Sequence, residues 1–88
     1  MKTIWKFPLK VADTQVVEIP MPAEILTIQM QSEIPCLWAL VNPDSENRSL
    51  KGIAIFGTGH PLPDRSMTYI GTFQLHGGAL VFHAFEVH

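Results

Sequence analysis

The chain has 88 residues, of which 47% are hydrophobic and 16% are charged, and its formal net charge is -2. A chain of this length is expected to form a single domain, residues 1–88, with a thin core, because it buries only about 60–65% of its unfolded surface. Charged residues usually make up about 25% of a globular protein, so we expect apolar surface that pairs with a second copy in a homo-oligomer. The Lys and Arg residues form no basic stripe, which excludes the usual mode of nucleic-acid binding.

The N-terminal segment and the apolar runs bear on the location of the protein, and the lone cysteine bears on its redox chemistry. The opening MKTIWKFPL lacks the apolar segment of a signal peptide, and no run approaches the about 20 apolar residues of a membrane span. We therefore expect a cytoplasmic protein without membrane contact. Cys36 has no partner for an internal disulfide, and its setting in IPCLWALV predicts a buried structural thiol, with a reactive thiolate as the alternative.

Apolar residues alternate along the first third of the chain, which predicts half-buried strands. The segments are TIWKFPL, TQVVEIP and ILTIQMQ, and the prolines of PMP end the second of them. A helix beginning at Ala23 is the alternative for the third segment, but its β-branched residues favour a strand. The residues expected to share one face are Trp5, Phe7 and Leu9 in the first strand, Val17 and Ile19 in the second, and Leu26, Ile28 and Met30 in the third.

Three later segments are apolar on both faces: Ile34 to Val41, and the stretches around residues 54 and 81. A small two-layer fold cannot easily cover both faces of so many strands. We expect a partner subunit to cover one face, and the alternative is that the chain's own loops do so.

The segment MTYIGTFQL lies between the last two of these stretches. Its alternation predicts Met67, Tyr69, Phe73 and Leu75 on one face, and Gly71 predicts a bulge or a close approach of another backbone. Short strands therefore recur about every ten residues with turn residues between them. This pattern predicts an all-β fold, a single small sandwich or barrel of about six to seven short antiparallel strands.

The segment FGTGHPLP is the strongest candidate for a binding loop. Two glycines leave backbone N–H groups accessible to an anion, and a hydroxyl and an imidazole lie beside them. Prolines follow instead of a helix, which excludes the phosphate loop and the dinucleotide fingerprint and keeps a plain strand-ending turn as the alternative. Aromatic rings and an arginine nearby would complete a pocket for a small nucleotide. The candidate ligand-binding residues are Gly57, Thr58, Gly59, His60, Arg65, Trp38 and Tyr69.

The sequence predicts no catalytic residue, no cofactor and no metal. The four histidines are spaced by 16, 7 and 5 residues, which matches no zinc pattern, although His60 and His76 both lie in turns and could share a metal or phosphate. His83 is interpreted as a core or interface residue. The acidic residues do not pair, and no Gly-x-Ser-x-Gly string occurs. A thiol- or metal-dependent enzyme using Cys36 or His60 is the alternative to a non-enzymatic protein.

Four strings carry a resemblance: IWKFPL, PCLWALV, IFGTGHPL and IGTFQLHGGALVFHAFE. Over nearly its whole length the chain resembles a family of short uncharacterised proteins of bacteriophage and prophage genomes. The resemblance implies a small phage-type accessory protein made inside the bacterial cell, and it transfers no catalytic residue.

From this context we expect a homo-oligomeric binding protein that sequesters a small, nucleotide-like signal of host defence. The alternative is a protein-binding inhibitor, counter-defence or anti-CRISPR-like, or a structural accessory factor with a host or virion protein as its partner.

Overall fold

The computed structural model describes residues 1–88, and every regular element in it is a strand except for one short 3-10 turn. This confirms the predicted all-β class. No helix in the chain is long and apolar enough to cross a membrane. The strands are β1 (Thr3–Pro8), β2 (Thr14–Pro20), β3 (Ala23–Gln31), β4 (Ile34–Val41), β5 (Arg48–Gly57), β6 (Met67–Leu75) and β7 (Leu80–Val87), and the turn η1 (His76–Gly78) joins the last two.

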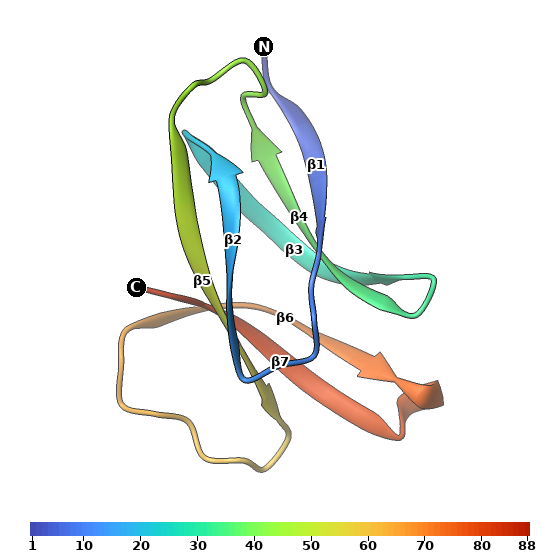
Figure 1. Ribbon diagram of the computed structural model, residues 1–88. Coiled ribbons are helices and arrows are strands. Elements are labelled where there is room, and N and C mark those ends of the chain that lie inside the picture. Colours follow the sequence, from blue (N-terminus) through green and yellow to red (C-terminus); the bar gives the residue numbers. More distant parts are fainter.

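The strands form two antiparallel sheets that face each other as a sandwich (Figure 1). One sheet has the order β1-β4-β3 and the other has the order β2-β5-β7-β6. The chain changes sheet between β1 and β2, and again at the cis peptide bond Met21-Pro22 before β3. β3 and β6, which form one edge of each sheet, contact each other.

The core lies between the sheets and draws apolar side chains from both. Alternate residues of each strand enter the core, because successive side chains of a strand point to opposite faces and only one face of each sheet is directed inward. β4, for example, contributes Leu37, Ala39 and Val41, while Cys36 of the same strand points the other way. The buried cluster is Leu9, Ile19, Ile28, Leu37, Ala39, Val41, Ile53, Ile55, Phe73 and Ala84.

The outer face of β4 is covered within the chain. Lys6 on β1 donates a hydrogen bond from Nζ to Gln31 Oε1 on β3, across the strand between them. Cys36 is 2% exposed, which confirms the predicted buried thiol, and Trp38 has its indole Nε1 buried without a hydrogen-bond partner. The chain's own side chains thus bury much of a strand that is apolar on both faces.

Two bulges overturn part of the predicted alternation. The register of β3 shifts between Ile25 and Thr27, so Ile25 packs on the core and Leu26 is 41% exposed instead of inward-facing. The register of β6 shifts between Tyr69 and Gly71, so Tyr69 is 56% exposed and does not share a face with the buried Phe73. Each bulge adds one residue to one strand, which turns the remaining side chains to the other face.

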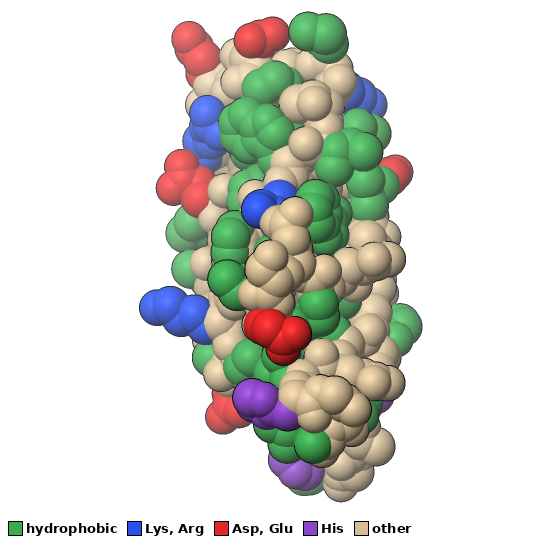
Figure 2. Space-filling view, turned by 90° about the vertical axis from the view of Figure 1, so that its right-hand side faces the viewer, with side chains coloured by type: hydrophobic (Ala, Val, Ile, Leu, Met, Phe, Trp, Pro, Cys, Tyr) green, Lys and Arg blue, Asp and Glu red, His purple; other side chains and the backbone are tan.

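Charged side chains are scattered singly over the surface, with apolar patches between them, on the face drawn in Figure 2. The scatter agrees with the low charged fraction and with the lack of a basic stripe in the sequence. Among charged groups the one ion pair joins Lys51 Nζ to Glu86 Oε2 at 3.5 Å.

Candidate functional site

The glycine-rich segment connects two strands that run in the same direction. β5 and β6 both pair with β7, so the chain must return from the Gly57 end of β5 to the Met67 end of β6. The connecting segment 58–66 does this as a loop at the lower left of Figure 1. Hydrogen bonds hold both ends of the loop. Thr58 N donates to Val81 O of β7 at 3.2 Å, and His88 N, just after β7, donates to Ser66 O at 3.0 Å.

The loop and the outer face of the four-stranded sheet, the face directed away from the core, enclose a first hollow of about 220 Å³. β5, β6 and β7 supply aromatic rings and an imidazole, and the loop supplies glycines, a hydroxyl and a second imidazole. The lining residues are Phe56, Gly57, Thr58, Gly59, His60, Leu62, Tyr69, His83 and Phe85.

Three aromatic rings form the apolar wall of the first hollow. Phe85 lies between the other two: its ring centroid is 5.8 Å from that of Phe56 and 5.5 Å from that of Tyr69, in edge-to-face arrangements. Such pairs are favourable because the positive ring edge meets the negative ring face. The rings are held in place by each other, and a planar ligand can stack on them without ordering mobile side chains.

A chain of hydrogen bonds runs beside these rings and is centred on His83. Its Nε2 lies 2.7 Å from Thr58 Oγ1, and its Nδ1 lies 2.8 Å from Thr72 Oγ1. The Thr72 hydroxyl is in turn 2.5 Å from the Tyr69 hydroxyl. β7, β6 and the loop thus contribute to one continuous network, which fixes Thr58 relative to the sheet.

Gly57 leaves room for the His60 side chain. The His60 N–H donates to Gly57 O at 3.1 Å, which makes a tight turn, and the imidazole folds back over the glycine. A Cβ at residue 57 would lie 2.9 Å from His60 Cε1, closer than van der Waals contact allows. Gly59 has a φ of +87°, the left-handed region that glycine adopts without strain. Both glycines therefore place His60 against the sheet.

A second hollow, of about 390 Å³, adjoins the first and shares Phe56, Gly57 and His60 with it. It lies where β5 extends beyond β2: the last strand pair is Thr14 with Ala54, and Ile55 N then donates to Asp13 O at 3.1 Å. Arg65 lines this hollow and supplies a planar guanidinium cation. The other lining residues are Val11, Ala12, Asp13, Thr14, Ala54, Ile55, Pro61, Pro63, Met67 and Phe82.

The structure brings together six of the seven residues predicted from the sequence. Gly57, Thr58, Gly59, His60 and Tyr69 line the first hollow, and Arg65 lines the second. Trp38 does not join them, because β4 belongs to the other sheet, where Trp38 pairs with Lys6 and Thr27.

Sequence analysis did not predict the residues that strand pairing brings to the first hollow, above all His83. His83 was interpreted as a core or interface residue, yet it is directly opposite Phe56 on one side and Thr72 on the other. Alternation in VFHAF does place His83 on one face with Phe85. That signal identifies the face, but the partners across the sheet depend on a register that the sequence does not reveal.

No group of three or more His, Cys, Asp or Glu side chains converges to hold a metal ion. His76, in the turn after β6, lines neither hollow and so does not share a site with His60. Cys36 is buried in the other sheet, with its thiol 3.5 Å from Ile34 O.

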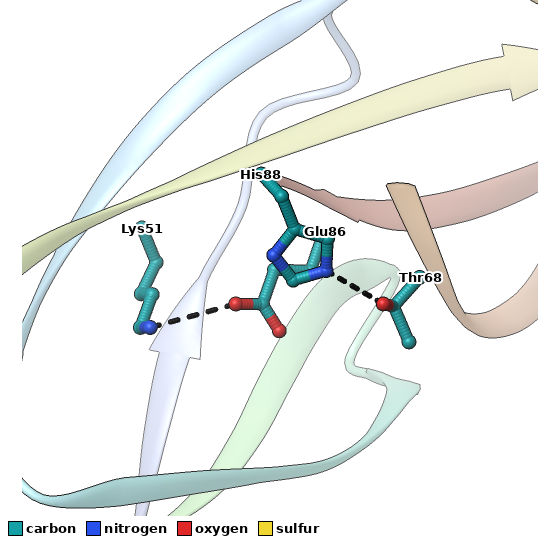
Figure 3. Close-up of polar contacts among 4 residues, drawn as sticks. All are labelled: Lys51, Thr68, Glu86 and His88. Atoms are coloured by element: carbon teal, nitrogen blue, oxygen red, sulfur yellow. Dashed lines mark hydrogen bonds and ion pairs between the residues drawn. The ribbon is translucent and has the colours of Figure 1, made fainter. Parts of the chain in front are cut away.

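A second polar cluster lies at the C-terminal end of β7 (Figure 3). Glu86 pairs with Lys51 of β5, and the His88 imidazole Nε2 lies 2.6 Å from Thr68 Oγ1 of β6. Together with the bond from His88 N to Ser66 O, these contacts join Glu86 to β5, and His88 to β6 and the loop. The cluster holds the far end of the loop 58–66 and is separate from both hollows.

Comparison with known proteins identifies the family. The model of DUF7352, a domain of unknown function, matches residues 1–88. The chain therefore belongs to the DUF7352 family. No curated protein and no solved structure matches the chain.

Proposed function

We propose that this member of the DUF7352 family is a non-enzymatic binding protein whose ligand is a small, nucleotide-like molecule. The observation that carries the proposal is the pair of adjoining hollows that share His60, one walled by aromatic rings and the other lined by Arg65. A planar base stacks in the first hollow, and an anionic group reaches the second. Apolar walls with a few convergent polar groups are typical of small-molecule sites.

The sizes and charges of the hollows support this division. The first, at about 220 Å³, accommodates one heteroaromatic base, and the second, at about 390 Å³, accommodates a sugar and a phosphate. The first hollow has no arginine, lysine or carboxylate in its lining. A phosphate is therefore expected beside Arg65, whose planar guanidinium forms paired hydrogen bonds with phosphate oxygens.

Calorimetry and thermal shift with adenosine 5′-monophosphate, adenosine, ADP-ribose and a cyclic dinucleotide test the proposal. We expect at least one phosphate-bearing compound to bind and to raise the melting temperature, because a ligand that binds only the folded state stabilises it. Adenosine should bind at least about tenfold more weakly than its monophosphate, because it loses the charge-assisted hydrogen bonds to Arg65.

The variant Arg65→Gln should remove the preference for the monophosphate over adenosine. Arg48→Gln is the matched control, because Arg48 is an exposed arginine at the opposite end of β5 and lines neither hollow. The proposal fails if none of the compounds changes the melting temperature of the wild-type protein.

We further propose that the protein acts as a homo-oligomer in the cytoplasm of a phage-infected bacterium, where it sequesters a signal of host defence. The resemblance to phage and prophage proteins supports the setting. Two apolar side chains support the assembly: Val16 and Leu50 are each 66% exposed on the outer face of the four-stranded sheet. We expect light scattering at micromolar concentration to give a multiple of 9.8 kDa, and a monomeric mass would contradict the assembly.

The other sheet favours a second candidate, a protein-binding inhibitor or structural accessory factor. Ile4 is 56% exposed and Leu26 is 41% exposed on the three-stranded sheet, away from both hollows. This candidate predicts that Ile4→Glu abolishes capture of a partner from infected-cell lysate and leaves binding of the monophosphate intact. Capture that Ile4→Glu does not change would count against it.

A further inference from the structure

The hydrogen-bond chain through His83 limits how many hydrogen-bond donors its two ends can present to a ligand. It consists of four side chains in the order Thr58, His83, Thr72 and Tyr69, and its two end residues, Thr58 and Tyr69, line the first hollow. A neutral imidazole has one nitrogen that donates and one that accepts. The protons in the chain are therefore ordered in one of two directions.

In the first direction Tyr69 donates to Thr72, Thr72 donates to His83 Nδ1, and His83 Nε2 donates to Thr58. The Thr58 hydroxyl proton is then free for the ligand, and the Tyr69 oxygen is left to accept. In the second direction every bond reverses, so that Tyr69 donates outward and Thr58 accepts. Both ring nitrogens have hydroxyl partners within 2.8 Å. The same heavy-atom positions therefore allow either order of the protons.

A neutral chain thus has one outward donor at one end and an acceptor at the other, and the two ends exchange roles together. We infer that the first hollow selects a planar ring that carries one hydrogen-bond donor and one acceptor, as in a carboxamide or a lactam. The inference rests on the proposed function and specifies the ligand of the same site.

A ring edge with two acceptors, such as a carboxylate, needs both end hydroxyls to donate. This requires both nitrogens of His83 to donate inward, which means that the imidazole takes up a proton. The other titratable groups in the hollow are His60, from the loop, and Tyr69, from β6. β5 and β7 contribute no further titratable group to it, and Arg65 and Asp13 line only the second hollow.

Nicotinamide and nicotinate provide a matched pair of probes, because they have the same ring with a carboxamide or a carboxylate. Calorimetry in buffers of different ionisation enthalpy counts the protons exchanged on binding. Wild-type protein should bind nicotinamide without proton exchange and with less than about a twofold change over the range where imidazoles titrate, about pH 5.5 to 8. Nicotinate should bind with the uptake of one proton, so that its dissociation constant rises about tenfold per pH unit at the alkaline end.

The variant Thr72→Val tests the chain itself. Valine has a similar shape and suits an exposed strand position, so the sheet should keep its fold. Without the Thr72 hydroxyl the ends are uncoupled, and the Tyr69 hydroxyl can donate whatever the state of His83. Nicotinate should then bind without proton uptake. His76→Gln is the control, because it removes an imidazole that lines neither hollow, and the uptake of one proton should persist.

The outcomes separate this inference from the proposed function. Nicotinate binding without proton uptake by the wild type, or unchanged uptake in Thr72→Val, overturns the inference. So does binding of adenosine 5′-monophosphate by a protein that binds neither ring probe. If neither ring probe binds and none of the four compounds used to test the proposed function binds, the proposed function fails and the inference fails with it.

Discussion

Replacing Gly71 by alanine should destabilise the protein by about 2 kcal/mol, a large loss for one methyl group. Gly71 lies on β6 where this strand contacts β3, and a Cβ there would be 2.8 Å from Ile28 Cγ2. Ile28 is 3% exposed, and its β-branched side chain has few alternative rotamers in which to avoid the clash. The two edge strands must therefore move apart, which disturbs the core on both sides of the contact.

Urea denaturation of Gly71→Ala, with Gly52→Ala as the control, measures this effect. Gly52 is also a strand glycine of the same sheet, but a Cβ there meets Val87 Cβ at an ordinary 3.4 Å. Its replacement should change the stability by less than about 0.5 kcal/mol. In an Ile28→Ala background, which removes Cγ2, Gly71→Ala should cost much less than alone. Equal losses at Gly71 and Gly52 would show that close contact between the sheets is unimportant.

Replacing Leu37 by alanine should lower the free energy of unfolding by about 3 kcal/mol. Leu37 is fully buried at the centre of the three-stranded sheet and faces the core between the sheets. The loss combines the transfer free energy of the deleted atoms with the cavity that they leave. A domain of this size has a total stability of only about 5–10 kcal/mol, so the variant should unfold at much lower denaturant concentration.

Leu40→Ala is the matched control, since Leu40 is on the same strand but points away from the core and is half-buried. We expect a loss of about 1 kcal/mol there, because fewer contacts and no enclosed cavity are involved. Denaturant unfolding followed by tryptophan fluorescence gives both values. A loss at Leu40 as large as that at Leu37 would contradict the assignment of the two faces of β4.

The loop and the strands could be predicted from the sequence because their signals are local. Glycines and prolines in FGTGHPLP indicate a turn whatever the rest of the chain does, and Gly71 indicates a bulge or close approach. Both features are present, since His60 turns back onto Gly57 and Ile28 lies against Gly71. The sequence is compatible with either a plain turn or a pocket wall, and in the structure the segment turns at Gly57 and lines both hollows.

The make-up of the pocket was less predictable because it depends on which strands become neighbours. Trp38 and Tyr69 are both aromatic residues of predicted strands, yet only Tyr69 reaches the loop, because β4 and β6 belong to different sheets. Tyr69 faces outward only because the bulge before Gly71 separates it from Phe73. His83 acquired its role from pairing opposite Phe56 and Thr72.

The sequence by itself determined the strand class, the positions of the turns and the presence of strands that are apolar on both faces. These properties follow from a side-chain period of two and from the conformational preferences of glycine and proline, which act within a few residues. Only the tertiary structure decided the strand order, the two register shifts and the group of side chains around His83. Those depend on hydrogen bonds between segments far apart in the chain, where a shift of one residue turns every later side chain to the opposite face.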